Sequence, residues 1–316
     1  LTNLCANVFS KYRERSNMKV ALTGGTGFIG SYIAMELVSS GHEVKILARN
    51  ADKVPFLHFI KGIEIVKAGM NDAEALSSAV SGCDALIHAA LCWGDSGPEM
   101  ILNETLASVK LLDIAVRSGI RNIIYTSSTA ATGYSHLITS EKSMRIPEDF
   151  YGATKGSVEL FCSAYSAKYP DLNLSIVRPG YTFGEPVVEG GSIENDKRFS
   201  DICSNIKNGV EIVLTKNDGT QFIHAADLAK IFRAVLESNK RNEIYFGLGS
   251  KFITWESITQ TASEITSKPI KLKLEDKGYP DEPSLFDVSK IEKDFGLKFT
   301  PDEQIENHLK YLLNRS

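Results

Sequence analysis

The chain has 316 residues, of which 43% are hydrophobic and 23% charged, a balance that suits a globular enzyme with a sizeable core and excludes a long disordered tail. Its formal charge of -4 excludes a basic face for nucleic acid, since binding to phosphates needs clustered lysines and arginines. The five cysteines are scattered without metal-ligand spacing, and no apolar run is long enough to span a membrane. We therefore expect a cytoplasmic protein with no metal, no nucleic-acid partner and no membrane partner.

The predicted elements alternate along the first half of the chain. Residues 1–17 precede Met18 and look like a leader or an added N-terminal arm, with neither the apolar core nor the cleavage site of a signal peptide. Short β-branched runs then predict strands at 18–24, 42–49, 62–68, 84–90, 122–128 and 174–180, with amphipathic helices between them, the first at 28–41. Such alternation predicts an α/β fold of the Rossmann type, in which a doubly wound parallel sheet carries helices on both faces.

The pattern loosens after residue 180, where the stretch 184–201 is rich in glycine and charge and reads as an exposed loop. We expect a first domain at 18–180, with residues 224–248 returning to its sheet. Residues 181–223 and 249–316 would then form a smaller, mostly C-terminal α/β domain that folds over the open edge of the first and supplies substrate contacts.

The turn TGGTGFIG, at 23–30, lies between the first predicted strand and the first predicted helix. Its glycines permit a tight turn, close approach of the backbone to a pyrophosphate, and close packing of helix on sheet. The helix N-terminus adds unpaired N–H donors and the positive end of a dipole. The first domain is therefore predicted to bind a dinucleotide, with contacts from Gly24, Thr26, Gly27, Phe28, Ile29 and Gly30.

The end of the second strand indicates which dinucleotide. A carboxylate there would accept from the adenosine ribose hydroxyls and select NAD, but this strand ends in Ala48 and Arg49. Arg49 can hold a 2′-phosphate through a charge-assisted pair, which favours NADP. NAD stays open as the alternative, with Arg49 a solvated strand end or a side chain stacked on adenine.

A hydroxyl cluster at the end of the strand 122–128 precedes Tyr151, which lies four residues before Lys155 in a predicted helix, so that the two side chains face the same way. A free tyrosine has a pKa near 10, and a nearby lysine and an oxidised nicotinamide both favour its ionised form. A serine hydroxyl can hold the substrate oxygen while a proton and a hydride are transferred. We expect this stretch to be an active site.

Taken together, these residues resemble the extended short-chain dehydrogenase/reductase superfamily, in its NAD(P)-dependent epimerase/dehydratase branch, from Met18 onward. The landmarks, in order, are TGGTGFIG, CDALIHAA, YTSSTAATG, YGATK, VRPGYTFG, FIHAADLA and FDVSKIEKDFGL. The resemblance implies catalytic roles for Ser128, Tyr151 and Lys155. It implies further cofactor contacts at Ala89, Ala90, Asn103 and Pro179, and a homodimer formed by the helix from Asn103 to Ser118 and the helix that starts at Tyr151.

Several positions depart from the pattern of nucleotide-sugar epimerases such as UDP-galactose 4-epimerase. The acid that often contacts adenine is replaced by Gly69, and the asparagine that meets the substrate diphosphate is replaced by Tyr181. The segment DGTQFIHAAD lacks the arginine that clamps that diphosphate, so a strong charge-assisted contact is missing. Arg198 or Lys197 could substitute, or both could be solvated. Substrate contacts are expected from Trp93, Ser128, Thr129, Tyr151 and Tyr181.

Three functions follow as hypotheses. The first is an epimerase-type enzyme that removes a hydride from a sugar or nucleotide-sugar carbon and keeps its cofactor bound. The second is an NADP(H)-dependent reductase of a small carbonyl compound, similar to dihydroflavonol reductases, which Arg49 and the missing arginine favour. The third is a non-catalytic NADP-binding protein, against which the complete set of Ser128, Tyr151 and Lys155 argues. Family resemblance tips the prediction toward the epimerase.

Overall fold

The computed structural model describes residues 17–133, 137–193 and 196–315. The predicted leader therefore lies almost wholly outside the described residues, as does Cys5. The other four cysteines are free thiols. Within the described ranges, every helix is too short or too polar to cross a membrane.

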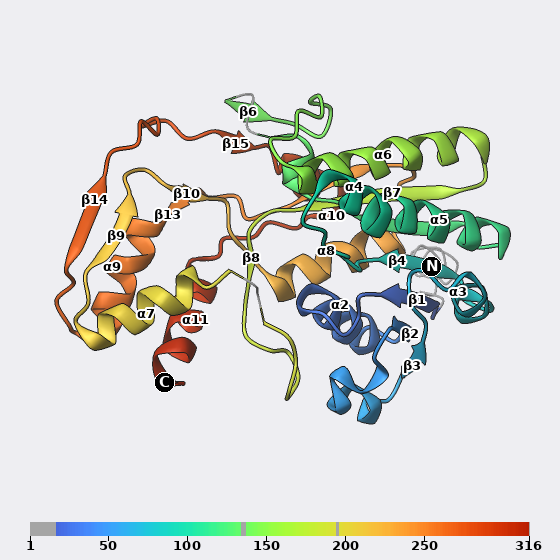
Figure 1. The fold of residues 1–316 in the computed structure, drawn as a ribbon, viewed down its shortest axis with the longest axis horizontal. Coiled ribbons are helices and arrows are strands. Elements are labelled where there is room, and N and C mark those ends of the chain that lie inside the picture. Colours follow the sequence, from blue (N-terminus) through green and yellow to red (C-terminus); the bar gives the residue numbers. More distant parts are fainter. Residues whose placement is uncertain (1–16, 134–136, 194–195, 316) are drawn as a thin grey trace, which may run out of the picture.

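The core of the fold is a seven-stranded parallel sheet with the order β12-β7-β5-β4-β1-β2-β3 (Figure 1). Its strands are β1 (Lys19–Thr23), β2 (Glu43–Ala48), β3 (Ile63–Lys67), β4 (Ala85–His88), β5 (Asn122–Thr126), β7 (Asn173–Pro179) and β12 (Ile244–Gly247). The chain builds outward from β1 in one direction and then, from β4, in the other. This order confirms the predicted doubly wound parallel sheet, and it places a crevice beyond the carboxyl ends of β1 and β4, where the winding reverses.

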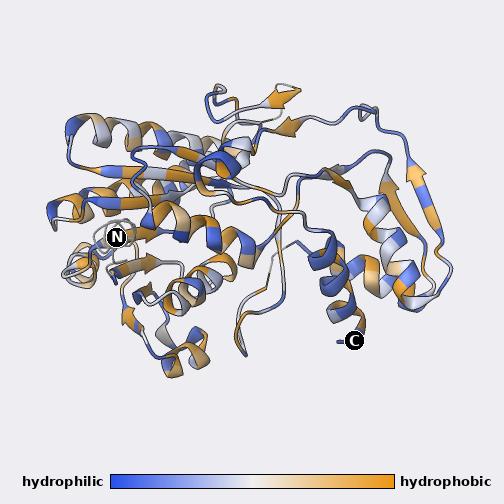
Figure 2. Cartoon of the chain, turned by 180° about the vertical axis from the view of Figure 1, so that it is seen from behind, coloured by the Kyte–Doolittle hydropathy of each residue, from blue (hydrophilic) through white to orange (hydrophobic). Residues whose placement is uncertain are grey.

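Helices cover both faces of this sheet because its strands are apolar on both sides. In β1, Val20 and Leu22 belong to one buried cluster and Ala21 to the other, as the two-residue period of a strand requires. The first cluster packs under α2 (Phe28–Ser39), α8 (Ala225–Glu237) and α10 (Ser289–Phe295). The second packs under α3 (Ala73–Val80), α5 (Ala107–Arg117) and α6 (Phe150–Lys168). Figure 2 shows these helices alternating between hydrophobic and hydrophilic residues.

A third buried cluster lies beside the large sheet and is strongly aromatic. Five aromatic rings form its centre: Tyr181, Phe183, Phe199, Phe222 and Trp255. The centroids of the rings that contact each other are 4.9 to 6.4 Å apart. The helices that enclose it are α7 (Arg198–Asn208), α9 (Trp255–Thr266) and α11 (Asp302–Asn314), grouped together in Figure 1. Aromatic packing of this kind fixes the segments that follow β7 against the C-terminal part of the chain.

In the part of the chain that the structure describes, four short strand pairs lie outside the large sheet. They are β8 (Thr182–Phe183) with β11 (Ile223–His224), β9 (Ile212–Thr215) with β14 (Leu272–Glu275), β10 (Gly219–Thr220) with β13 (Ile253–Thr254), and β6 (Ile138–Thr139) with β15 (Leu285–Phe286). The remaining elements are short helical segments: η1 (Ala51–Lys53), η2 (Pro55–Phe59), α4 (Gly97–Met100), η3 (Ile101–Leu106) and η4 (Thr129–Ala131). Three of these, η1, η3 and η4, carry residues of the candidate site.

Candidate active site

A cavity of about 750 Å³ opens beyond the carboxyl ends of β1 and β4. It is lined by the glycine turn, the ends of β2 and β3, residues 89–93, Tyr151, and residues 180–182, 192, 193 and 196. We call the glycine turn together with Ala48, Arg49 and Lys53 the cofactor wall. Trp93, Tyr151, Tyr181 and Asp196 form the substrate wall.

The glycines of the cofactor wall are required by close backbone packing. Gly24 has a φ of +75°, and a Cβ built on it would lie 2.7 Å from the carbonyl group of Ala89. A Cβ on Gly30 would lie 2.1 Å from the carbonyl oxygen of Gly24. Gly27 caps α2 without a side-chain hydrogen bond, which leaves the first N–H groups of that helix directed at the cavity. This cradle fits the pyrophosphate of a dinucleotide.

The end of β2 and the segment η1 that follows it bring positive charge to the same wall. Arg49 is exposed and lines the cavity, as does Lys53 from η1. Gly69 leaves the space beside Arg49 open, since a Cβ there would contact the arginine side chain at 3.8 Å. Among the described lining residues the single carboxylate is Asp196, which belongs to the substrate wall. The cofactor wall therefore carries two cations and no carboxylate among its described lining residues.

The hydroxyl cluster and the helix that carries Tyr151 are held together by close packing. Ser128 follows β5 and caps η4, accepting a hydrogen bond from the Ala130 N–H at 3.1 Å. A Cβ on Gly152 would lie 2.2 Å from the Ala130 carbonyl oxygen, so a glycine is needed there for α6 to approach η4. The residue directly after Tyr151 thus allows α6 and η4 to pack closely against each other.

Tyr151 and Lys155 lie on one face of α6, as their spacing predicted. Tyr151 is half-buried and lines the cavity, and the Lys155 ammonium is 5.8 Å from the centre of its ring. Lys155 is buried and donates to the carboxylate of Glu104 at 2.6 Å and to the carbonyl oxygen of Thr126 at 3.3 Å. Sequence reasoning missed Glu104. Its signal was a charged residue at a position of the helix that should have been apolar.

Asn103, expected near the cofactor, is exposed and lies outside the cavity lining. Its side chain donates to the carbonyl oxygen of Trp93 at 3.4 Å, and the next residue, Glu104, takes the buried position. Pro179 is buried at the end of β7, and its neighbour Gly180 lines the cavity instead. Ser128, Thr129 and Lys155 are buried and lie outside the cavity lining. The other predicted contact residues line the cavity: Gly24, Thr26, Gly27, Phe28, Ile29, Gly30, Arg49, Ala89, Ala90, Trp93, Tyr151 and Tyr181.

A buried histidine, His88, links β4 to β1 beneath the site. His88 Nδ1 is 2.7 Å from the Thr23 hydroxyl, and His88 Nε2 is 2.9 Å from the Ser108 hydroxyl. Burial, with a smaller contribution from the charge of Lys155, lowers the pKa of His88 to about 3. The ring is therefore neutral at physiological pH. Its role is structural, because both of its nitrogens are hydrogen-bonded to hydroxyl groups.

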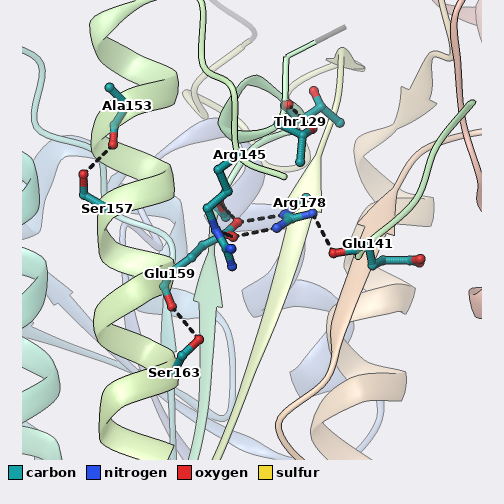
Figure 3. Close-up of polar contacts among 10 residues, drawn as sticks. Thr129, Glu141, Arg145, Ala153, Ser157, Glu159, Ser163 and Arg178 are labelled. Carbon is teal, nitrogen blue, oxygen red and sulfur yellow. Dashed lines mark hydrogen bonds and ion pairs between the residues drawn. The ribbon is translucent and has the colours of Figure 1, made fainter. Parts of the chain in front are cut away.

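A second buried network of polar side chains, part of which is drawn in Figure 3, connects the elements that carry the site. Glu159 of α6 accepts two hydrogen bonds from Arg178 of β7, at 2.6 and 2.8 Å, and one from Arg145 at 2.7 Å. The hydroxyl of Ser127, next to Ser128, donates to Glu159 at 2.5 Å. Although burial raises the pKa of Glu159, its bonds to Arg178 and Ser127 outweigh burial and lower the pKa. The carboxylate therefore remains charged and ties α6, β5 and β7 together.

The substrate wall is aromatic and has no free cation among its described residues. Trp93 stacks on Tyr151 with 5.6 Å between ring centroids. Arg198, a candidate for binding a diphosphate, makes a bidentate pair with Asp196 and lies 4.4 Å over the Trp255 ring. Gln221, in the segment that lacks the expected arginine, is buried and bonded to the backbone of Gly249 and Phe286.

Two polar residues of the segment FIHAADLA, His224 and Asp227, have structural partners. The His224 ring caps α8 by accepting from the Ala226 N–H at 3.2 Å, and it contacts the Glu185 carboxylate at 3.3 Å. Asp227 is buried and accepts from Lys230 and Gln304. Neither residue lines the cavity.

Known proteins are similar in sequence over most of the chain. UDP-glucose 4-epimerase of Corynebacterium glutamicum is 25% identical over 307 residues, covering 90% of this chain and 91% of that protein. Cinnamoyl-CoA reductase 2 of Medicago truncatula is 24% identical over 307 residues, covering 90% and 88%.

Among solved structures, UDP-glucuronic acid 4-epimerase from Bacillus cereus in complex with NAD has a TM-score of 0.80 at 19% identity, covering 94% of this chain and 99% of that one. At that identity the likeness shows a shared fold. The model of the NAD dependent epimerase/dehydratase family matches residues 20–246, which is most of the chain. The chain therefore belongs to the NAD dependent epimerase/dehydratase family of enzymes.

Proposed function

We propose that the protein is an NADP(H)-dependent oxidoreductase that transfers a hydride between its cofactor and the hydroxyl or carbonyl carbon of a small, uncharged compound. The observation that carries this proposal is the charge distribution of the cavity. Its cations, Arg49 and Lys53, belong to the cofactor wall, whereas the substrate wall offers aromatic rings and the carboxylate Asp196. A diphosphate substrate would meet that wall without a charge-assisted contact.

Reduction of a carbonyl group requires one hydride at carbon and one proton at oxygen, and a nicotinamide dinucleotide held by the glycine turn would supply the hydride. The chain supplies the proton from the hydroxyl of Tyr151, a residue that lines the cavity. Ser128 is suited to hold the substrate oxygen, and Lys155 to favour the ionised tyrosine that remains after proton transfer. The reverse sequence oxidises an alcohol.

Arg49 supports NADP as the cofactor. A guanidinium group matches a phosphate through two parallel hydrogen bonds, and Gly69 leaves the neighbouring space free. The likeness to cinnamoyl-CoA reductase over most of both chains fits a net reduction.

Epimerisation of a nucleotide sugar is the second candidate, supported by the likeness to UDP-glucose 4-epimerase over 90% of this chain. It would require Arg198 to leave Asp196 and reach the substrate.

One experiment separates the two candidates. The purified protein is incubated with NADPH or NADH and a panel of uncharged aldehydes and ketones, and cofactor oxidation is followed by absorbance. In parallel, UDP-glucose and UDP-galactose are tested for interconversion without added cofactor. We expect substrate-dependent oxidation of NADPH and no interconversion. Interconversion by a protein that retains tightly bound NAD would contradict the proposal and support the epimerase.

We also infer that the protein forms a homodimer through η3, α5 and α6. Leu102 and Leu106 of η3 and Leu160 and Phe161 of α6 are exposed, and η3 and α5 both contact α6. Apolar side chains gathered on adjoining helices are typical of an interface. Light scattering should give twice the mass of the chain, and Leu160→Glu should give the monomer. A monomeric wild-type protein would exclude this interface.

A further inference from the structure

The segment η3 has its charged residue inside and its apolar residues outside. It is a π-helical segment between α4 and α5, in which Ile101, Leu102 and Leu106 are 41 to 58% exposed and Glu104 is 2% exposed. This reverses the usual placement, because burying a carboxylate is costly unless it is paired and hydrogen-bonded. Single π-turns inserted in helices occur frequently at functional sites.

Both oxygens of the Glu104 carboxylate have partners from the site. Oε1 accepts from the Lys155 ammonium at 2.6 Å, and Oε2 accepts from the backbone N–H of Cys92 at 2.9 Å. Cys92 precedes Trp93, whose ring stacks on Tyr151. The carboxylate therefore joins the lysine of the active site to the loop that forms the substrate wall.

The contacts of Lys155 leave one donor available. An ammonium group has three N–H bonds, and two are used by Glu104 and by the Thr126 carbonyl oxygen. The third remains for the cofactor or the tyrosine. A lysine stem has four rotatable bonds, so without Glu104 its ammonium would sample other positions.

We propose that Glu104 is a positioning residue for the reaction proposed above: it holds the Lys155 ammonium in place and offsets its charge, so that Lys155 alone does not drive the ionisation of Tyr151. This inference rests on the proposed function, since Tyr151 must be the proton donor. The chemistry is electrostatic, because a cation beside a tyrosine stabilises tyrosinate and a carboxylate beside that cation opposes the effect.

The other titratable groups around Lys155 do not replace Glu104. The Tyr125 ring of β5 lies 5.3 Å from the ammonium, and burial, followed by the charge of Glu104, raises the pKa of Tyr125. His88 of β4 is neutral, and burial raises the pKa of the Cys92 thiol. On α6 itself, Glu159 is occupied by Arg178 and Arg145. Glu104 is thus the carboxylate that pairs with Lys155 in the described part of the chain.

The test is a tyrosine titration of the cofactor-free protein, followed by ultraviolet absorbance. Each protein is compared with its own Tyr151→Phe derivative, so that the difference reports Tyr151. In Glu104→Gln, which keeps the shape and removes the charge, we expect half-ionisation of Tyr151 to move to lower pH by about one unit. Glu104→Asp, which keeps the charge, should retain the wild-type curve. So should the control Asp113→Asn, which removes a partly buried carboxylate of α5 that pairs with Arg117 and Tyr165.

An unchanged curve in Glu104→Gln would overturn the proposal. Since the titration needs no substrate, it remains informative if Tyr151→Phe proves fully active, a result that would refute the proposed function instead. The pH profile of kcat/KM for Glu104→Gln should shift in the same direction as the titration.

Stability provides a second route if Glu104→Gln folds poorly. Removing one member of a buried ion pair leaves the other uncompensated, whereas removing both is often nearly neutral. The thermal midpoint of Glu104→Gln with Lys155→Gln together should therefore fall by less than the sum of the two single changes. Additive losses would show that the two side chains do not depend on each other.

Discussion

The two walls of the cavity are built in different ways. The cofactor wall comes largely from one continuous turn, where backbone meets backbone so closely that Gly24 and Gly30 leave no room for a Cβ. The substrate wall joins side chains from segments far apart in the chain, and Trp93, one of its main rings, is 62% exposed. A wall made of backbone depends on the sheet, whereas a wall made of loop side chains can change without disturbing the core. The cofactor wall is therefore the better guide to the enzyme class, and the substrate wall to the substrate.

Tyr151 belongs to the substrate wall and should give the largest effect. Tyr151→Phe removes the hydroxyl that we propose as proton donor and keeps the ring that Trp93 stacks on, so kcat/KM should fall by about a thousandfold. Affinity for NADPH, measured by fluorescence titration, should stay close to that of the wild type because the cofactor wall is untouched. Unchanged turnover would remove Tyr151 from the reaction.

A change in the buried network around Glu159 should lower the stability of the protein. Glu159→Gln leaves Arg178 and Arg145 without their carboxylate, and we expect a loss of about 3 kcal/mol in the free energy of unfolding. The pKa of Glu159 is lowered in the folded protein, so its contribution is present above the ordinary glutamate pKa, near 4.3, and is lost as the pH falls through the lowered value. Urea denaturation should show a difference from wild type at pH 7 that shrinks below pH 4. If the difference between the two proteins did not change with pH, the charge of Glu159 would not be the cause of the stabilisation.

Arg49 tests the cofactor wall by itself. Arg49→Glu should weaken NADP binding by about thirtyfold, because it replaces a charge-assisted contact with repulsion of a phosphate. NAD binding should change little, since NAD has a hydroxyl at that position. Calorimetry with both cofactors measures the ratio, and equal losses would show that Arg49 does not contact the 2′-phosphate. Lys53→Glu is a matched comparison on the same wall.

Substitution of Trp93 should give the smallest effect, and it tests whether the substrate wall contributes to binding of the substrate. Trp93→Ala removes one aromatic stack, worth about 1 kcal/mol, so KM for the substrate should rise severalfold while kcat and NADPH affinity change little. A large fall in kcat with constant KM would instead place Trp93 in the ordering of Tyr151.

Prediction from the sequence was most complete where function depends on local pattern. The alternating strands and helices gave the doubly wound sheet, since apolar periodicity reports which faces are buried. The glycine turn and the Tyr151–Lys155 spacing were visible for the same reason: each lies within a few residues of chain, and its geometry follows from one turn or one helix.

Long-range polar pairing was invisible to the sequence. Asn103 and Glu104 are neighbours, and only the π-helical segment decides that Glu104 is buried against Lys155, 51 residues later, while Asn103 is exposed. In the same way, only tertiary packing shows that Arg198 is held by Asp196 and Trp255 and that Gln221 joins two distant segments. The sequence by itself determined the fold class and the cofactor cradle, because these follow from local geometry and hydrophobic period. The tertiary structure decided the charge of the substrate wall and the partner of Lys155, because an ion pair depends on where distant side chains meet.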